Sequence, residues 1–147
     1  MAMAFAPQLQ QLDAVKAALL QQPEDLYQAR LAEAEAARVL KTAKKRLGDV
    51  EAEIADALAD IAALVAGDKT LKNAAARKLE VRTRAKDEPA IAALEERRAP
   101  LEAELLNAEM AKTAAELQVK RREDEQRAWR GRLDALAIEC SLLVAGR

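Results

Sequence analysis

Residues 36–66 read AARVLKTAKKRLGDVEAEIADALADIAALVA, and the apolar side chains of this stretch recur at alternating steps of four and three residues. The members of this series are Ala36, Leu40, Ala43, Leu47, Val50, Ile54, Ala57, Ile61 and Leu64. A mean step of 3.5 residues keeps one narrow seam of a helix facing a partner helix, as a coiled coil requires. The stretch therefore predicts a long helix with one buried seam, in which Leu47 and Ile54 are core residues.

A second series of the same kind lies in the C-terminal part of the chain. Its members are Ile91, Leu94, Leu101, Leu105, Ala108, Ala115, Val119, Trp129, Leu133, Leu136, Cys140 and Leu143. Because only a short stretch joins the two series, we expect the helices to fold back on one another as an antiparallel pair, with Leu101 and Leu105 in the core. A parallel homodimer of extended helices is the competing arrangement. Gly67 and Pro89 argue against the continuous rod that it requires.

Prolines and glycines predict where the first helices begin and end. A short N-terminal helix is expected over residues 7–22, followed by a break at Pro23. A long helix then follows over residues 24–66, with Gly67 as a left-handed C-cap. The short helix is expected to cover the open end of the helix pair as the third helix of a bundle.

The second half of the chain has comparable start signals. A tip region is expected over residues 67–89. Asp87 is then the expected N-cap of a long helix over residues 90–145, which Pro100 either kinks or starts. The predicted fold is all-α, one helical domain over residues 1–147, built as a long antiparallel coiled-coil hairpin with a short N-terminal helix.

The composition agrees with long helices and excludes several kinds of chemistry. Hydrophobic residues make up 51% of the chain, charged residues 33% and aromatic residues only 2%, which favours narrow helical seams over a wide globular core. There is no histidine, so the commonest general base and metal ligand is missing. No glycine-rich phosphate loop and no Cys/His metal spacing occurs. We therefore expect no enzymatic activity, no cofactor and no metal site, and we interpret Cys140 as a small buried apolar residue.

The sequence also predicts a cytoplasmic protein. The apolar stretch Met1–Ala6 is too short and uncharged for a signal peptide, and no apolar run approaches the roughly 20 residues of a membrane span. A single cysteine fits a reducing compartment. The formal net charge of −1 gives no overall attraction to nucleic acid or to membranes.

Four polar residues interrupt the second series, namely Arg98, Lys112, Arg122 and Gln126. Burying them without partners would be costly. We expect them to extend toward water or to pair with carboxylates on the facing helix. The alternative is that they determine the register or the oligomeric state.

Positive charge is concentrated between residues 69 and 86. Only Glu80 is acidic there, against the seven basic residues Lys69, Lys72, Arg77, Lys78, Arg82, Arg84 and Lys86. The preceding segment is acidic and contains Asp49, Glu51, Glu53, Asp56 and Asp60. On a helix, basic side chains four residues apart repel one another, so this arrangement is favourable only with anions beside it. Those anions are the protein's own carboxylates, an acidic partner, or phosphates. No aromatic residue in this segment is available for base stacking.

The stretch Lys72-Asn73-Ala74-Ala75-Ala76-Arg77 resembles a Lys-Asn-x-x-x-Arg element of small helical proteins of tailed bacteriophages and prophages, which are often encoded near recombination or single-strand-annealing genes. The resemblance covers about residues 24–143, and its specific positions are Lys72, Asn73 and Arg77. That group often has glycine before the lysine, where Leu71 stands here. The resemblance implies a non-enzymatic accessory role in phage DNA recombination or replication.

These observations together predict a binding surface for nucleic acid or an acidic protein. The expected site residues are Lys69, Lys72, Asn73, Arg77, Lys78, Arg82, Arg84 and Lys86, with Asn73 and Arg77 shaping the turn that presents the others. The alternative is a structural or scaffolding coiled coil, such as a phage assembly component, whose own acids neutralise the segment. A homo-oligomer is expected in either case, because apolar residues lie off the main seams, namely Leu58, Val65, Leu106, Met110 and Leu117.

Overall fold

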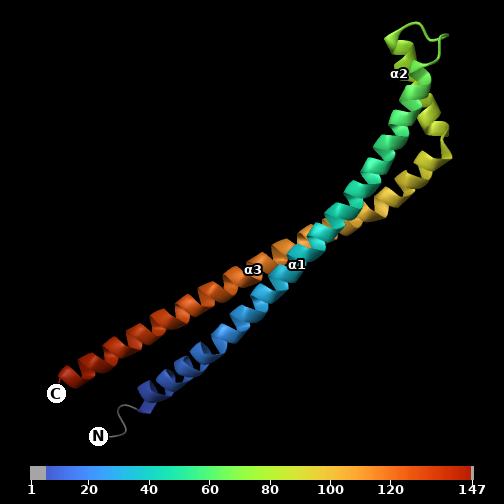
Figure 1. The fold of residues 1–147 in the computed structure, drawn as a ribbon. Coiled ribbons are helices and arrows are strands. Elements are labelled where there is room, and N and C mark those ends of the chain that lie inside the picture. The colour runs from blue at the N-terminus through green and yellow to red at the C-terminus, as the bar shows by residue number, and fades with distance from the viewer. Residues whose placement is uncertain (1–5, 147) are drawn as a thin grey trace. The chain divides into compact units, whose positions relative to one another are not determined.

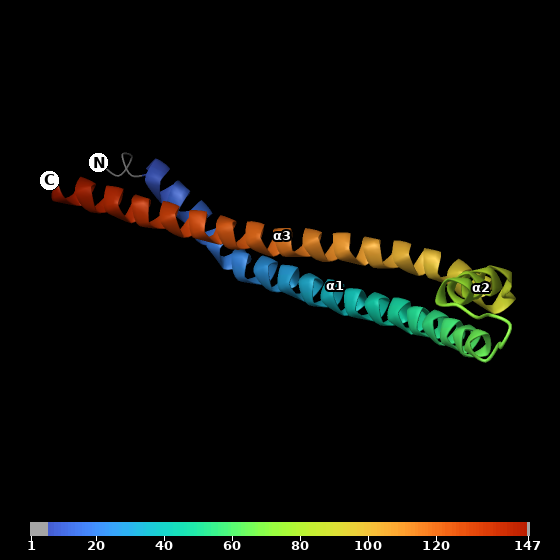
Figure 2. The same ribbon diagram turned by 90° about the horizontal axis from the view of Figure 1, so that it is seen from above.

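The computed structural model describes residues 6–146, and three helices occupy them (Figure 1). They are α1 (Ala6–Ala66), α2 (Ala74–Asp87) and α3 (Pro89–Ala145). The long helices α1 and α3 pack antiparallel, as Figures 1 and 2 both show. The all-α prediction and the antiparallel pairing are thus confirmed. The short helix, however, lies in the middle of the chain and not at the N-terminus.

The predicted break at Pro23 is wrong, because α1 runs through it without interruption. Proline removes one backbone hydrogen bond and costs about 3 kcal/mol inside a helix. Pro23 is exposed, however, while Val15 and Gln22 before it are buried and Leu26 after it is half-buried. Continuous packing of this face across Pro23 outweighs the local penalty. The residues expected to form a separate covering helix are therefore the first turns of α1.

Contacts divide the chain into two compact units. One, called the α2 unit here, contains residues 37–110 and therefore the end of α1, all of α2 and the start of α3. The other, called the terminal unit, combines the described residues up to Ala36 with those from Ala111 onward. The packing inside each unit is different.

The α2 unit has an apolar core along the predicted seam. Its buried residues are Ala43, Leu47, Val50, Ile54, Ile61 and Val65 of α1 together with Ile91 and Ala108 of α3. The burial predicted for Leu47 and Ile54 is confirmed. Leu101 and Leu105, however, are only half-buried, because two helices alone leave one side of their seam open.

The seam changes register at the end of α1. Leu64, the last member of the predicted series, is 68% exposed, whereas Val65 is only 1% exposed. The reason is a third neighbour: Leu71 and the α2 residues Val81 and Ala85 pack against Ile61, Val65 and Ile91. Because these residues cover a different side of α1, the last buried position of the helix is Val65 and not Leu64. Val65 is therefore a core residue and not part of an open apolar surface.

The ends of α1 and α2 also differ from the prediction. Gly67 does not adopt a left-handed conformation, and its amide donates to the carbonyl of Ala63 at 3.2 Å. The helix nevertheless ends at Ala66 as predicted. Asp87 is the last residue of α2, and Glu88 in an extended conformation separates it from α3. Pro89 is the first residue of α3, a position where its missing N–H costs nothing. Pro100 lies within α3 and does not start it.

The terminal unit has a more polar interior. Its buried residues are Val15 and Gln22 of α1 and Leu136 of α3, and the Oε1 atom of Gln22 has no hydrogen-bond partner among the described residues. Other members of the second series, including Trp129 and Cys140, are half-buried. Leu143, the last member of that series, is exposed.

Three of the four polar residues of the second seam, all but Gln126, remain partly exposed to water and pair with carboxylates. Their partners lie on α3 itself and not on the facing helix: the pairs are Arg98–Glu102 at 3.1 Å, Lys112–Glu116 at 2.9 Å and Arg122–Glu125 at 2.9 Å. Partners three or four residues away are already adjacent on a helix surface, so little side-chain ordering is needed. The hydrogen bond to Glu116, together with its negative charge, raises the pKa of Lys112. Hydrogen bonds from Arg122 and Arg121 lower the pKa of Glu125.

Candidate functional site

The predicted basic surface begins in the turn that follows α1. Asp68 organises this turn, because its Oδ1 atom accepts hydrogen bonds from the Thr70 amide at 2.9 Å and from the Thr70 hydroxyl at 2.6 Å. The Leu71 amide donates to the backbone carbonyl of Asp68 at 3.3 Å. The bonds from Thr70, and to a smaller extent the charge of Arg84, lower the pKa of the Asp68 carboxyl. An aspartate that bonds to the backbone two residues later is a common way to reverse a chain.

Asn73 and Arg77 determine how α2 starts. Asn73 is the N-cap, and its side-chain oxygen accepts a hydrogen bond from the Ala76 amide at 2.7 Å. Its backbone carbonyl accepts from the Arg77 amide at 3.1 Å. The Arg77 Nε atom in turn donates to the carbonyl of Leu71 at 3.0 Å, which ties the helix back to the turn. Two of the eight predicted site residues therefore have a clear local structural role.

Replacing Asn73 with alanine should loosen the first turn of α2, because the Ala76 amide loses its acceptor. Loss of such a cap costs about 1 kcal/mol, which corresponds to about fivefold faster exchange of the protected amides of α2. Hydrogen exchange followed by NMR measures this change directly. The Asn73→Asp variant keeps an acceptor oxygen and should exchange like the wild type. Equal protection in Asn73→Ala and the wild type would contradict the capping role.

The outer face of α2 carries cations that have no anionic partner among the residues that the structure describes. Lys78, Arg82 and Lys86 follow one another at steps of four residues and are exposed. Lys69 and Lys72, in the turn before the helix, are exposed as well. Within residues 6–146 none of these five side chains forms an ion pair. The opposite face of α2 packs on Ile61 and Ile91 at the end of the α2 unit, beside α1 and α3 (Figures 1 and 2).

Arg84 behaves differently from the other predicted site residues. Its Nε atom is 2.7 Å from Glu80 Oε1, and its Nη2 atom is 3.7 Å from Asp68 Oδ2. The only acid of the segment is therefore used by one arginine, which faces the turn. The remaining cations have no acid of their own within the segment.

Leu79 was missed by the sequence analysis. It is 66% exposed and lies one turn before Arg82 on the outer face of α2. Its place next to three cations gives this surface an apolar element. The helical spacing of Leu79 with Arg82 and Lys86 was a signal that was available in the sequence.

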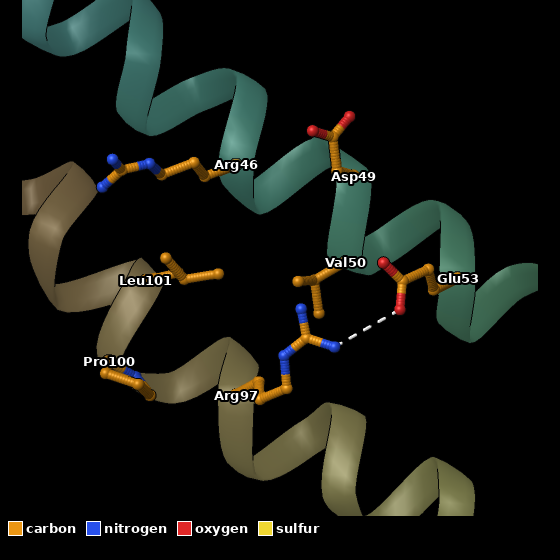
Figure 3. A pocket seen from close by; sticks show the side chains of 7 residues that line it. All are labelled: Arg46, Asp49, Val50, Glu53, Arg97, Pro100 and Leu101. Atoms are coloured by element: carbon orange, nitrogen blue, oxygen red, sulfur yellow. Dashed lines mark hydrogen bonds and ion pairs between the residues drawn. The ribbon is translucent and has the colours of Figure 1, made fainter.

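A groove between α1 and α3 also lies in the α2 unit. Figure 3 shows that side chains of α1 and α3 line it, namely Arg46, Asp49, Val50, Glu53, Arg97, Pro100 and Leu101. Its two arginines are paired, Arg97 with Glu53 at 3.4 Å and Arg46 with Glu104 at 2.9 Å. The lining contains no cysteine, serine or histidine, so it offers no nucleophile with a neighbouring base. The groove is the place where the seam between α1 and α3 is left partly open, beside the half-buried Leu101.

Metal sites and membrane spans are two further features that the described residues could contain. In the part of the chain that is described, no group of three or more acidic, cysteine or histidine side chains is placed to hold a metal ion. No helix over residues 6–146 is long and apolar enough to cross a membrane. Comparison with protein-family models, with curated proteins and with solved structures finds nothing that matches this chain. The role of the α2 surface therefore has to be inferred from its own residues.

Proposed function

We propose that the chain is a non-enzymatic interaction protein, an antiparallel coiled-coil hairpin whose α2 surface binds the phosphate backbone of nucleic acid. One observation carries the proposal: Lys69, Lys72, Lys78, Arg82 and Lys86 are exposed and form no ion pair with any described carboxylate. This is notable because the neighbouring part of α1 is rich in acids. The internal neutralisation that a purely structural role predicts is limited to Arg84.

Physical considerations favour a polyanion as the partner. Cations on successive turns of one helix repel one another and weaken it slightly. Phosphates remove this repulsion, and each contact also releases a condensed counterion from the nucleic acid. Backbone contacts carry no sequence information, and residues 69–86 contain no aromatic side chain that would stack on bases. The proposed binding is therefore electrostatic and nearly independent of sequence.

The more specific form of the proposal is an accessory role in phage DNA recombination or replication, as the Lys72-Asn73-x-x-x-Arg77 resemblance implies. In this chain Asn73 and Arg77 hold the turn and the helix start, and Lys72 is left exposed beside them. The spacing therefore has a local structural reason, and this supports the element as a unit. A cytoplasmic location belongs to the same proposal.

A structural or scaffolding coiled coil is the second candidate function. It is favoured by the large apolar side chains that remain exposed on both long helices, including Leu20, Tyr27, Leu106, Met110, Leu117 and Ile138. Such side chains are typical of surfaces that a further helix covers. In that case the protein would assemble without binding nucleic acid.

Charge reversal separates the two candidates. We expect Lys78→Glu/Arg82→Glu to bind single- and double-stranded DNA at least about tenfold more weakly than the wild type in a fluorescence anisotropy titration at low salt. The matched control is Lys44→Glu/Lys45→Glu, which makes the same charge change at exposed positions of α1 in the same unit.

Three outcomes decide the matter. Weaker binding by the α2 variant alone supports the proposal. Absence of binding by the wild type at low salt rejects nucleic acid as the partner and leaves the scaffold, or an acidic protein, as the explanation. Equal weakening in both variants would mean that DNA responds to total charge and that α2 is not the site.

A further inference from the structure

The face of α3 that points away from α1 carries a second heptad series within the terminal unit. From Ala114 onward, steps of three and four residues select Ala114, Leu117, Arg121, Asp124, Ala128, Gly131, Ala135, Ile138 and Leu142. Every one of them is exposed, whereas the inner seam residues Val119, Trp129 and Leu136 are half-buried or buried. Leu117, Ile138 and Leu142 are 62%, 62% and 67% exposed. A series of about four heptads is long enough for a helix-pairing seam.

The middle of this outer series is built for close approach. Ala128, Gly131 and Ala135 follow one another there, and the large residues lie toward its two ends. A Cβ atom at Gly131 would meet nothing within 4 Å, so packing within the chain does not require this glycine. Glycine inside a helix is unfavourable unless a backbone or another helix comes near. The small residues leave room for a second helix at this point.

We propose that this outer face of α3 forms a homodimer in which the α3 helices of two copies pack antiparallel, around a two-fold axis near residues 129 and 130. In this register Ala128 lies opposite Gly131 of the second copy. Leu117 lies opposite Leu142 of the second copy, so large residues meet at both ends. Ile138 lies opposite Arg121, whose aliphatic stem covers it while the guanidinium reaches water. This inference is independent of the proposed nucleic-acid binding.

The charged residues that flank the outer series are complementary to those of a second copy of this chain, and they favour an antiparallel pair. In the proposed register Arg127 lies opposite Asp134 of the second copy, and Glu125 lies opposite Arg132, each twice by symmetry. Opposite charges at such flanking positions select partner and orientation. A parallel pair would place Arg127 opposite Arg132 and Asp134 opposite Glu139, which repel. The present pairs Arg127–Asp124 at 3.2 Å and Arg121–Glu125 at 3.1 Å are exposed and free to exchange for these.

Sedimentation equilibrium of the full chain at micromolar concentrations tests the proposal. The wild type should have twice the mass of one chain. Ile138→Asp should weaken dimerisation at least about hundredfold, because two apolar contacts are lost in each dimer. The matched control is Leu20→Asp, a change of the same kind at an exposed residue on α1. A monomeric wild type, or loss of the dimer in Leu20→Asp but not in Ile138→Asp, would overturn the proposal.

A second variant tests the direction without touching an apolar residue. Arg127→Asp places two acids opposite each other in the antiparallel pair and should weaken dimerisation at least about tenfold. In a parallel pair the same change would place the introduced carboxylate opposite Arg132 and strengthen dimerisation. Lys16→Asp, at an exposed position of α1, is the control for charge and should leave the dimer unchanged. The double variant Arg127→Asp/Asp134→Arg should dimerise more strongly than Arg127→Asp, because it restores the opposite charges. Stronger dimerisation of Arg127→Asp than of the wild type would contradict the antiparallel arrangement.

Discussion

Replacing Ile61 with alanine should lower the free energy of unfolding by about 2–5 kcal/mol. Ile61 belongs to the buried cluster in which α1, α2 and α3 meet, together with Val65 and Ile91. Removing its side chain leaves a cavity between three helices, and the surrounding helices relax only partly into it. Urea denaturation followed by circular dichroism measures the loss as a shift of the midpoint at unchanged slope.

Leu64→Ala is the matched control for this experiment. The heptad spacing predicts that Leu64 is as buried as Ile61, but its side chain is 68% exposed. Its truncation should therefore change stability by no more than about 0.5 kcal/mol. A loss in Leu64→Ala as large as that in Ile61→Ala would show that α1 keeps the uninterrupted heptad register and that α2 does not pack as described.

The DNA affinity of the α2 surface should fall about 500-fold when the salt concentration rises from about 50 to about 200 mM. Five phosphate contacts give a slope of about −4.5 for the logarithm of the binding constant against the logarithm of the salt concentration on double-stranded DNA, and a smaller slope on single strands. The five proposed contacts are those of Lys69, Lys72, Lys78, Arg82 and Lys86. Anisotropy titrations at four or more salt concentrations give this slope.

The slope also counts the contacts that a variant has lost. Removing both Lys78 and Arg82 by mutation to alanine should reduce it by about 1.8, because each duplex contact contributes about 0.9. Arg84→Ala should leave the slope nearly unchanged, since Arg84 is already paired with Glu80. A slope near zero for the wild type, or one that Arg84→Ala reduces as much as the double variant, is incompatible with the proposed set of contacts.

The sequence located the cluster of basic residues but not the different structural roles of its members. Eight residues were expected from local charge and from a short resemblance. The structure uses Asn73 and Arg77 to hold the turn and pairs Arg84, which leaves five cations facing outward. Charge counting finds the cluster, but which arginine pairs with Asp68 and Glu80 depends on the path of the turn. That path is decided by hydrogen bonds between residues 68 and 77.

The sequence alone determined the helical class, most of the buried seam of α1 and the antiparallel direction of the two long helices, because a 3.5-residue period and a short connection are local properties. Only the tertiary structure decided how these elements combine. Helix α1 continues through Pro23 because its packed face extends on both sides of that residue. Val65 replaces Leu64 in the core because α2 folds back onto the end of α1. In both places contacts between distant segments outweigh a local preference of a few kcal/mol, and single-helix periodicity contains no information about such a third neighbour.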